Sequence, residues 1–494
     1  MQRPILPFIM TKKPSFFLAL FPVIFLIAAL SINVVGVYGD DALSGSNQVI
    51  LLLSGLLAMI VGRQMGVEWE TLFQAVGKSI ANSATAMVIL LLIGGLAASW
   101  LLGGVVPAMI HYGLELLDPT FFLPASLIIC AAVSLATGSS WSTTATMGIA
   151  LIGIGKAMGI SEAMTAGAVI SGAYFGDKLS PLSDTTNLAP AMAGTDLFTH
   201  IRYMCWTTVP SIAIALIAFV FIGLGAAEQG ELQQSAFIQG VLETHFHMTP
   251  WLFAAPAAVV LLIALRVPAI PSIFAGIAAG LLCAFLFQAE LLSTLSPTDD
   301  VEDLYRLVMD TVAQGVSVHT ESEMVNELLN ASGMEGMLGT IWLILSAMVF
   351  GGAMEGAGLL RVISERLLRL ARTDFSLIGT TSATSIGLNL TASDQYLAIV
   401  VPGRMYAQAY EERGLAPENL SRTLEDAGTV TSVLVPWNTC GAYQSSVLGV
   451  ATGAYLPYAI FNWLSPLMTL AFSLLSVRIK RISRSDGSDS EIEA

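Results

Sequence analysis

Eight apolar stretches, each close to the length that crosses a lipid bilayer, dominate this sequence. A helix needs about 20 mostly apolar residues to span the hydrocarbon core. The candidate spans are residues 14–37, 48–62, 83–102, 205–225, 250–265, 268–289, 338–360 and 454–477. Only 12% of the 494 residues are charged, whereas soluble proteins average about 25%. We therefore expect an all-α polytopic membrane protein.

Two further blocks, residues 120–200 and 375–450, are interrupted by Gly, Pro, Ser, Thr and Asn too often for ordinary spans, yet they are too apolar for water. Opened backbone at membrane depth is tolerated only when it is buried in protein or lines a cavity. Each block is therefore expected to hold a re-entrant hairpin followed by a broken helix. The expected ranges are about 120–156 and 162–200 in the first block, and about 375–411 and 417–450 in the second.

Positive charges predict the orientation of the chain, because Lys and Arg favour the cytoplasmic side. With the N-terminus inside and each block counted as one hairpin plus one span, 18 of the 21 Lys and Arg residues lie inside. Lys156 and Arg306 lie outside, and Lys178 lies within the membrane. We expect ten spans, two re-entrant hairpins, both termini in the cytoplasm, and a place in the cell (inner) membrane.

The two blocks align without a gap at a shift of 255 residues, which pairs Pro181 with Pro436 and Gly159 with Gly414. The connection at 103–119 has no Lys or Arg, whereas its counterpart at 361–373 has four Arg. This opposite bias predicts an inverted 5+5 repeat, which is typical of secondary transporters with a midplane site. The expected division is a first repeat at 1–226, a second at 227–477 with a polar loop at about 289–337, and a polar cytoplasmic tail at 478–494.

The first expected break, "FGDKLSPLSDTTN" at 175–187, gathers charge and hydroxyls. Pro181 frees a carbonyl one turn upstream, because proline cannot donate a backbone hydrogen bond. Oxygen ligands suit hard cations, so an ion site is one interpretation; a proline kink that only serves packing is the other. The candidate ligands at this break are Asp177, Ser180, Ser183, Asp184, Thr185 and Asn187, and Asn438 and Thr439 occupy the matching break.

The expected hairpin tips also carry polar residues at corresponding positions. They are Thr137, Ser139 and Ser140 in the first block, and Ser393 and Asp394 in the second. Small residues could instead permit close helix packing, but packing does not account for Asp394. Each half could thus build a site from one tip and one break, and we hypothesise Na+ at Ser139, Asp184 and Thr185.

Ionisable side chains in membrane segments indicate a functional role by default. Beyond the break and tip carboxylates they include Lys178, Glu355, Glu425 and Asp426. Lys178 could be the charge partner of Asp177, which would be a purely local pair. Glu355 could relay protons or pair with a cation, and Glu425 with Asp426 could form a vestibule at the inner mouth. One carboxylate that binds either Na+ or H+ would make the two ions compete.

Three strings resemble the NhaC family of Na+/H+ antiporters: "SLATGSSWSTTATMGIALIGIGKAMGI", "SGAYFGDKLSPLSDTTNLAPAMAGTDLFTHIRYM" and "NLSRTLEDAGTVTSVLVPWNTCGAYQSSVLGVATGAYLPYAIFNW". The resemblance covers about 80–475. It implies Na+/H+ exchange or Na+-coupled malate–lactate exchange, an elevator-type transport domain on a scaffold, and a homodimer. It also implies sodium sites at hairpin tips and facing breaks: Thr137, Ser139 and Ser140 with 180–187, and Ser393 and Asp394 with 432–439.

Other functional classes find little support. The aspartates lack the GxGD context of an intramembrane protease, no Walker A motif indicates ATP as the energy source, and no basic patch indicates nucleic-acid binding. His245 and His247 have no third metal ligand nearby, and the four Cys are expected to be packing residues. We expect a cofactor-free Na+/H+ antiporter in the lipid bilayer, not an enzyme. The alternative is Na+- or H+-coupled exchange of small carboxylates such as malate and lactate.

Overall fold

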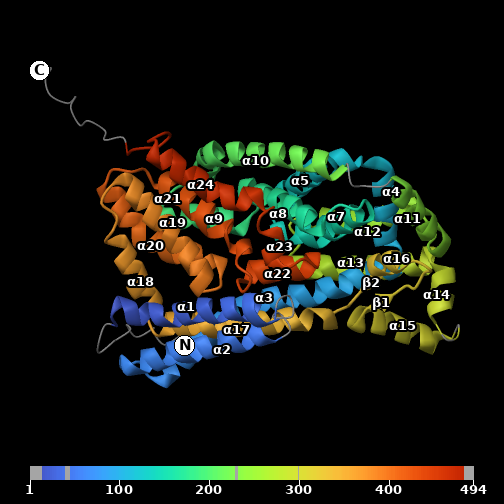
Figure 1. Cartoon of the computed structure of the whole chain (residues 1–494), viewed down its shortest axis with the longest axis horizontal. Helices are drawn as coiled ribbons and strands as arrows, with labels where there is room; N and C mark the ends of the chain where they lie inside the picture. Colours follow the sequence, from blue (N-terminus) through green and yellow to red (C-terminus); the bar gives the residue numbers. More distant parts are fainter. Residues whose placement is uncertain (1–13, 39–44, 228–231, 297, 299, 483–494) are drawn as a thin grey trace, which may run out of the picture.

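The computed structural model describes residues 14–38, 45–227, 232–296, 298 and 300–482, and these are almost entirely helical (Figure 1). The helices of the N-terminal half are α1 Phe16–Ser31, α2 Ser46–Gln64, α3 Trp69–Leu102, α4 Val105–Leu116, α5 Pro119–Thr137, α6 Ser140–Thr143, the π-helical turn η3 Thr144–Gly148, α7 Ile149–Ala157, α8 Glu162–Leu179, α9 Asp184–Ala193 and α10 Leu197–Ala227. A second π-helical turn, η1 Ile32–Tyr38, extends α1.

The C-terminal half continues the same style of short and long helices. It comprises α11 Leu232–His245, η4 Pro250–Phe253, α12 Ala254–Ala264, α13 Ala269–Phe287, α14 Ala289–Leu295, α15 Val301–Gln314, α16 Glu323–Leu328, η5 Glu335–Met337, α17 Leu338–Gly356, α18 Leu359–Leu368, α19 Asp374–Thr391, α20 Gln395–Glu412, α21 Pro417–Leu424, η6 Glu425–Thr429, η7 Ser432–Leu434, α22 Thr439–Leu448, α23 Thr452–Tyr455 and α24 Ile460–Leu474. Two short strands, β1 Val316–Ser317 and β2 Asn330–Ala331, pair antiparallel.

Among the described residues, six helices are long and apolar enough to cross a membrane. A seventh candidate combines Ala236–His245 with Pro250–Ala264, which meet at a bend of 91°. The shorter apolar helices α1 and α24 join them. The chain is therefore a polytopic membrane protein with a predominantly helical fold.

One side of the molecule is a layer of long helices. Helix α2 packs on α17, α17 packs on α3, and α3 packs on α13. Figure 1 shows α1, α2, α3 and α17 running side by side along one long edge, whereas α10 runs along the opposite edge. The interrupted helices of both blocks lie between these two edges.

Helices α5 and α8 make the closest helix pair of this central region. A Cβ added at Gly172 of α8 would run into the Leu127 carbonyl oxygen of α5, and one at Gly176 would run into that of Ala131. Only glycine allows two helix backbones to approach this far, as in small-xxx-small membrane interfaces. The first hairpin and the helix that leads to the first break therefore pack as one unit.

Special backbone positions recur in the two blocks at the 255-residue shift. Left-handed residues stand at both tips and at two later helix ends, in the pairs Gly138 and Ser393, Gly159 and Gly414, and Gly194 and Gly449. The helix after each tip is capped by Ser139 or Asp394, and the helix after each break by Ser183 or Asn438. The same backbone conformations and caps thus recur at corresponding positions of the two blocks.

Several elements differ from the expected spans in extent. Helix α3 begins at Trp69, 14 residues before the apolar stretch, because the polar sequence 69–82 continues the same helix. The connections at 103–119 and 361–373 are not simple loops, since they contain α4 and much of α18. The polar segment 289–337 likewise carries α14, α15, α16 and the strand pair.

Candidate functional site

A cavity of about 290 Å³ lies where the two hairpin tips and the two breaks converge. Its wall takes residues from the middle of α3, from the first tip and break, and from the second tip and break. The predicted residues that line it are Ser139, Ser140, Asp177, Asp184, Asp394 and Thr439. Residues that are 255 apart in the alignment therefore contribute to a single site.

The first tip is held directly against the first break. Ser139 Oγ accepts a hydrogen bond from the Ser142 backbone N–H at 3.1 Å and so caps α6. A Cβ at Gly138 would lie 2.9 Å from the Ser183 nitrogen, so glycine is required for this approach. Ser140 Oγ donates to Asp177 Oδ2 at 2.7 Å, which fixes that buried carboxylate relative to the tip.

The first break satisfies most of its own backbone. Asn187 Nδ2 donates to the Pro181 carbonyl at 3.0 Å, and Thr186 Oγ1 donates to the carbonyls of Asp177 and Lys178 at 3.2 and 3.1 Å. Ser183 caps α9. The carbonyls that Pro181 was expected to free thus already accept hydrogen bonds, which leaves side-chain oxygens as the more available ion ligands.

The second tip and break are joined in the same manner. The Thr439 N–H donates to the Ser393 carbonyl at 3.0 Å, and Asp394 Oδ1 accepts from the Leu397 N–H at 2.9 Å. Asn438 caps α22 by accepting from the Cys440 N–H at 3.0 Å. In both halves, therefore, a helix N-terminus follows the tip and another follows the break.

Side chains also connect the two halves across the cavity. The Tyr396 hydroxyl, next to the second tip, donates to the Asp184 carboxylate of the first break. Trp141 of the first hairpin stacks on Tyr443 of α22 with ring centroids 4.0 Å apart, and the Tyr443 hydroxyl donates to the Trp141 carbonyl at 2.9 Å. The cavity is thus closed by contacts between halves that are distant in sequence.

Several polar atoms at the cavity are buried without a hydrogen-bond partner among the described residues. They are Ser83 Oγ, Trp141 Nε1 and Asp177 Oδ1 in the wall, with Thr137 Oγ1 and Ser393 Oγ at the two tips. Leaving a buried polar atom unpaired is costly, so most native ones have a partner. The oxygens suit a cation or water, whereas the indole N–H suits an anion or water.

The hypothesis that Lys178 pairs with Asp177 is wrong. Lys178 is fully buried, and its Nζ contacts the Asp426 carboxylate and donates to Ser465 Oγ at 3.0 Å. Asp426 also accepts from Ser465 at 2.7 Å, from Thr207 Oγ1 at 2.8 Å, and from Thr469. This pair joins α8 to η6 and leaves Asp177 and Asp184 to the cavity.

The vestibule expected at Glu425 and Asp426 is also wrong, because both side chains are completely buried. Asp426 belongs to the ion pair. Neither carboxylate oxygen of Glu425 has a hydrogen-bond partner within the described part of the chain. A charged carboxylate in that state would be very costly.

The remaining candidates lie outside the cavity wall. Thr185 is buried against Ser183, with 3.2 Å between their hydroxyl oxygens, and Glu355 is half-buried on α17. The residues that do not line the wall are Thr137, Lys178, Ser180, Ser183, Thr185, Asn187, Glu355, Ser393, Asp426 and Asn438.

Sequence reasoning missed part of the wall. Asn82, Ser83 and Thr85 enter it from α3, and Trp141 and Tyr396 from the hairpins. Gln395, the alignment partner of Ser140 at the second tip, also lines it. The string "ANSAT" at 81–85 is an uncharged polar interruption where an apolar stretch begins. That interruption was the available signal for the contribution of α3.

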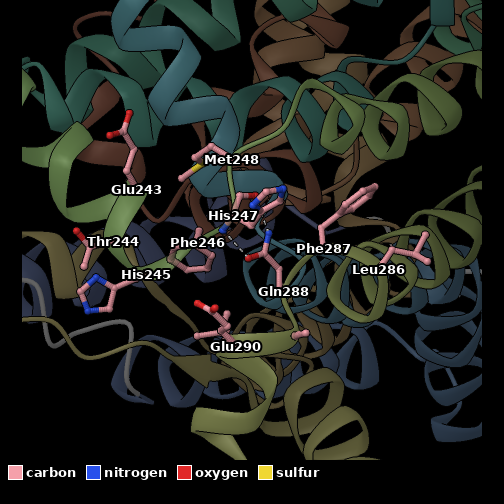
Figure 2. Close-up of a pocket in the computed structure, with 12 residues that line it drawn as sticks. Glu243, Thr244, His245, Phe246, His247, Met248, Leu286, Phe287, Gln288 and Glu290 are labelled. Atoms are coloured by element: carbon pink, nitrogen blue, oxygen red, sulfur yellow. Dashed lines mark hydrogen bonds between the residues drawn. The ribbon is translucent and has the colours of Figure 1, made fainter.

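A second cavity, of about 630 Å³, surrounds the two histidines (Figure 2). His245 and His247 lie on either side of Phe246, and the Gln288 side chain accepts from the His247 N–H at 3.0 Å and donates to its carbonyl at 3.1 Å. Across the described ranges, no group of three His, Cys, Asp or Glu side chains could hold a metal ion. The Gln288 side chain thus ties the segment that follows α11 to the C-terminal end of α13.

Apolar helices around a polar cavity built from interrupted helices define a solute transporter of the membrane-embedded, secondary-active class. The model of the Na+/H+ antiporter family matches residues 172–477, so the chain belongs to this family, that of the NhaC antiporters. Its matched region contains both breaks and the second hairpin. The protein is therefore a transporter and not an enzyme.

Relatives of this chain agree with the family. It is 38% identical to the Na+/H+ antiporter NhaC of Alkalihalophilus pseudofirmus over 87% of this chain and 90% of the relative. It is 35% identical to NhaC of Bacillus subtilis over 85% and 90%. A malate-2H+/Na+-lactate antiporter of Bacillus subtilis is also 35% identical, over 85% and 86%.

Proposed function

We propose that this protein exchanges Na+ for H+ across the cell membrane by alternating access. The observation that carries the proposal is the cavity at the convergence of both tips and both breaks, which is lined by Asp177 and Asp184 and in which Asp177 Oδ1 has no hydrogen-bond partner among the described residues. Because a carboxylate can bind either ion, Na+ entering the cavity would displace a proton. Kinship with NhaC antiporters supports the same assignment.

The Na+ site that we propose is centred on the Asp177 carboxylate. Ser139, Ser140 and Asp184 would supply further oxygen ligands to the ion. Asp177 is buried and keeps one free oxygen, whereas Asp184 is exposed at the cavity mouth and bound by Tyr396. Thr185 supports this site through Ser183. Asp394, Asn438 and Thr439 would form the matching side in the second half.

The mechanism that we propose uses an inverted 5+5 repeat with two re-entrant hairpins. Support comes from the left-handed residues and caps that recur at the 255-residue shift. The layer of α2, α3, α13 and α17 would be the scaffold, and the hairpins with the broken helices would be an elevator-type transport domain. Both termini would be cytoplasmic in the inner membrane, and the scaffold layer would serve a homodimer.

A second candidate function is coupled exchange of small carboxylates. The unpaired Trp141 N–H in the cavity wall is a donor that suits an anion, and one relative is named as a malate–lactate antiporter. Lys178, the nearest cation to the first break, is already paired with Asp426 and so offers no free positive charge to such an anion. This observation favours inorganic ion exchange.

Vesicle transport separates the two functions. The purified chain is reconstituted into vesicles that contain no organic acid. It is expected to take up Na+ when the vesicle interior is made more acidic than the outside, so that protons flow outward. Uptake that appears only after malate or lactate is loaded would contradict Na+/H+ exchange and favour the second function. Empty vesicles with the same lipids provide the background.

Asp184→Asn is expected to raise the half-saturating Na+ concentration at least about ten-fold, which corresponds to ~1.4 kcal/mol of lost binding free energy. The amide keeps the shape of the side chain and can still accept from Tyr396, so the fold should persist. Na+-dependent exchange in the same vesicles gives the measurement. Tyr396→Phe is the matched control, since it removes the hydrogen bond and keeps the charge; an unchanged Na+ dependence in Asp184→Asn would exclude Asp184 from the site.

A further inference from the structure

A basic cavity of about 500 Å³ lies at the start of α10, far along the chain from the hairpin tips. Thr199, Arg202, Tyr203 and Trp206 line it from α10, and residues 478–480 line it from the opposite side. No acidic side chain is part of this lining. The proposed transport function gives this cavity no role.

The segment 478–482, here called the C-terminal strap, is fixed by hydrogen bonds. The Ala416 N–H donates to the Lys480 carbonyl at 2.9 Å, and the Ile482 N–H donates to the Gly414 carbonyl at 2.9 Å. Asn419 Nδ2 also donates to the Lys480 carbonyl, at 2.6 Å. These hydrogen bonds fix the position of the strap, and they therefore also fix the shape of the cavity between the strap and α10.

The charges around this cavity are unbalanced. Arg202 and Arg478 are exposed and form no ion pair within the described residues, whereas Lys480 pairs with Glu418. Behind the wall, the fully buried Arg422 guanidinium lies 4.7 Å from the Tyr203 ring centroid. Four basic side chains, those of Arg202, Arg422, Arg478 and Lys480, therefore lie in or behind the cavity wall, and Glu418 neutralises one of them.

The Arg422 guanidinium is buried with most of its hydrogen-bond donors unpaired, as expected next to an anion site. Its Nε and Nη2 have no hydrogen-bond partner in the part of the chain that the structure describes, and its Nη1 reaches only the Arg478 carbonyl at 3.4 Å. Uncompensated buried charge is strongly unfavourable. An anion in the adjacent cavity would lower that cost through its field, even without direct contact.

The same cavity adjoins a surface suited to lipid. Arg478 stacks on Trp206 with its guanidinium carbon 3.8 Å from the ring centroid, and Trp206 is 45% exposed. The exposed apolar face of α10 continues through Val209 and Ile217. Tryptophan favours the membrane–water interface, and basic pockets between membrane helices suit anionic headgroups.

We propose that this cavity binds the phosphate of an anionic phospholipid, with the acyl chains lying along the exposed face of α10. Arg202 and Arg478 would contact the phosphate, and Arg422 would contribute its charge from behind. Free inorganic phosphate shares the headgroup chemistry. The apolar face of α10 favours the lipid, because a soluble ion would make no use of it.

Lipid binding to the purified full-length chain tests the proposal. Phosphatidylglycerol is titrated onto the protein in a neutral detergent, and native mass spectrometry measures the dissociation constant of the first bound lipid. Arg202→Gln/Arg478→Gln is expected to weaken it about thirty-fold, since each cation near a membrane surface changes affinity roughly five-fold. Arg202→Lys/Arg478→Lys should retain most of the binding, because the charges remain.

Matched controls distinguish this site from general attraction to arginine. Arg361→Gln/Arg369→Gln removes two exposed arginines near α18 and should leave the dissociation constant unchanged. An equal loss in that control, or equal binding of phosphatidylcholine, would overturn the proposal.

Displacement of the lipid by inorganic phosphate would assign the cavity to a soluble anion instead. If the double variant does not fold, the single Arg202→Gln variant replaces it, because Arg202 makes no ion pair with any described residue.

Discussion

Lys178→Met is expected to lower the free energy of unfolding by about 3–5 kcal/mol, which is the usual effect of removing one member of a buried ion pair. The variant leaves the fully buried Asp426 carboxylate with only the hydroxyls of Ser465, Thr207 and Thr469. The measurement is the unfolding midpoint in detergent, together with the fraction of monodisperse protein. A large fall in both is the expected result.

A second substitution shows whether charge is the cause. Lys178→Met/Asp426→Asn removes both charges and keeps an acceptor for the three hydroxyls, so most of the lost stability should return. The exposed pair of Arg361 and Glu365, 2.8 Å apart, provides the comparison, because Arg361→Met should cost less than about 1 kcal/mol. Wild-type stability in Lys178→Met alone would show that the buried pair does not hold the two halves together.

Asp177→Asn is expected to reduce Na+-dependent exchange by at least about ten-fold. The substitution keeps the acceptor for Ser140 but removes the buried negative charge, and hydrogen bonds and contacts to charged groups contribute about 1.5–3 kcal/mol. Exchange in vesicles that contain no organic acid gives the rate. Stabilisation of the detergent-solubilised protein by Na+ gives binding independently of transport.

Glu162→Gln is the matched control for Asp177→Asn. Glu162 lies in the first turn of the same helix, α8, and pairs with Lys156 at 3.1 Å outside the cavity. It should retain exchange and Na+ stabilisation. A fully active Asp177→Asn protein would remove Asp177 from the ion site and move attention to Asp184 and the second tip.

The order of the elements was predictable because membrane helices must satisfy their own backbone. Runs of apolar residues therefore predict the ends of α2, α13 and α17 to within four residues, and prolines with flanking hydroxyls predict both breaks. Short helices such as α4 and α18 were not predicted, since they lack the length of a span. Their existence depends on packing against neighbouring helices, which a hydropathy pattern does not contain.

The site was partly predictable for a similar reason. Polar residues at tips and breaks are conspicuous in an apolar sequence, so Ser139, Ser140, Asp177 and Asp184 could be named. The partner of Lys178 could not, because Asp426 lies 248 residues away and a nearer aspartate offered a simpler pair. Trp141 and Tyr396 were equally hidden, since aromatic residues are ordinary in membrane helices and only their position relative to the cavity distinguishes them.

The unequal hairpin tips limit how this gene can change over generations. Gly138 has no room for a side chain beside Ser183, whereas its counterpart Ser393 keeps one in the same left-handed conformation and is followed by an acid instead of a serine. The two tips are therefore not interchangeable. Copying the second tip's residue onto the first would crowd Ser183, and copying the first tip's serine onto the second would remove the Asp394 carboxylate, so selection should keep the two tips different.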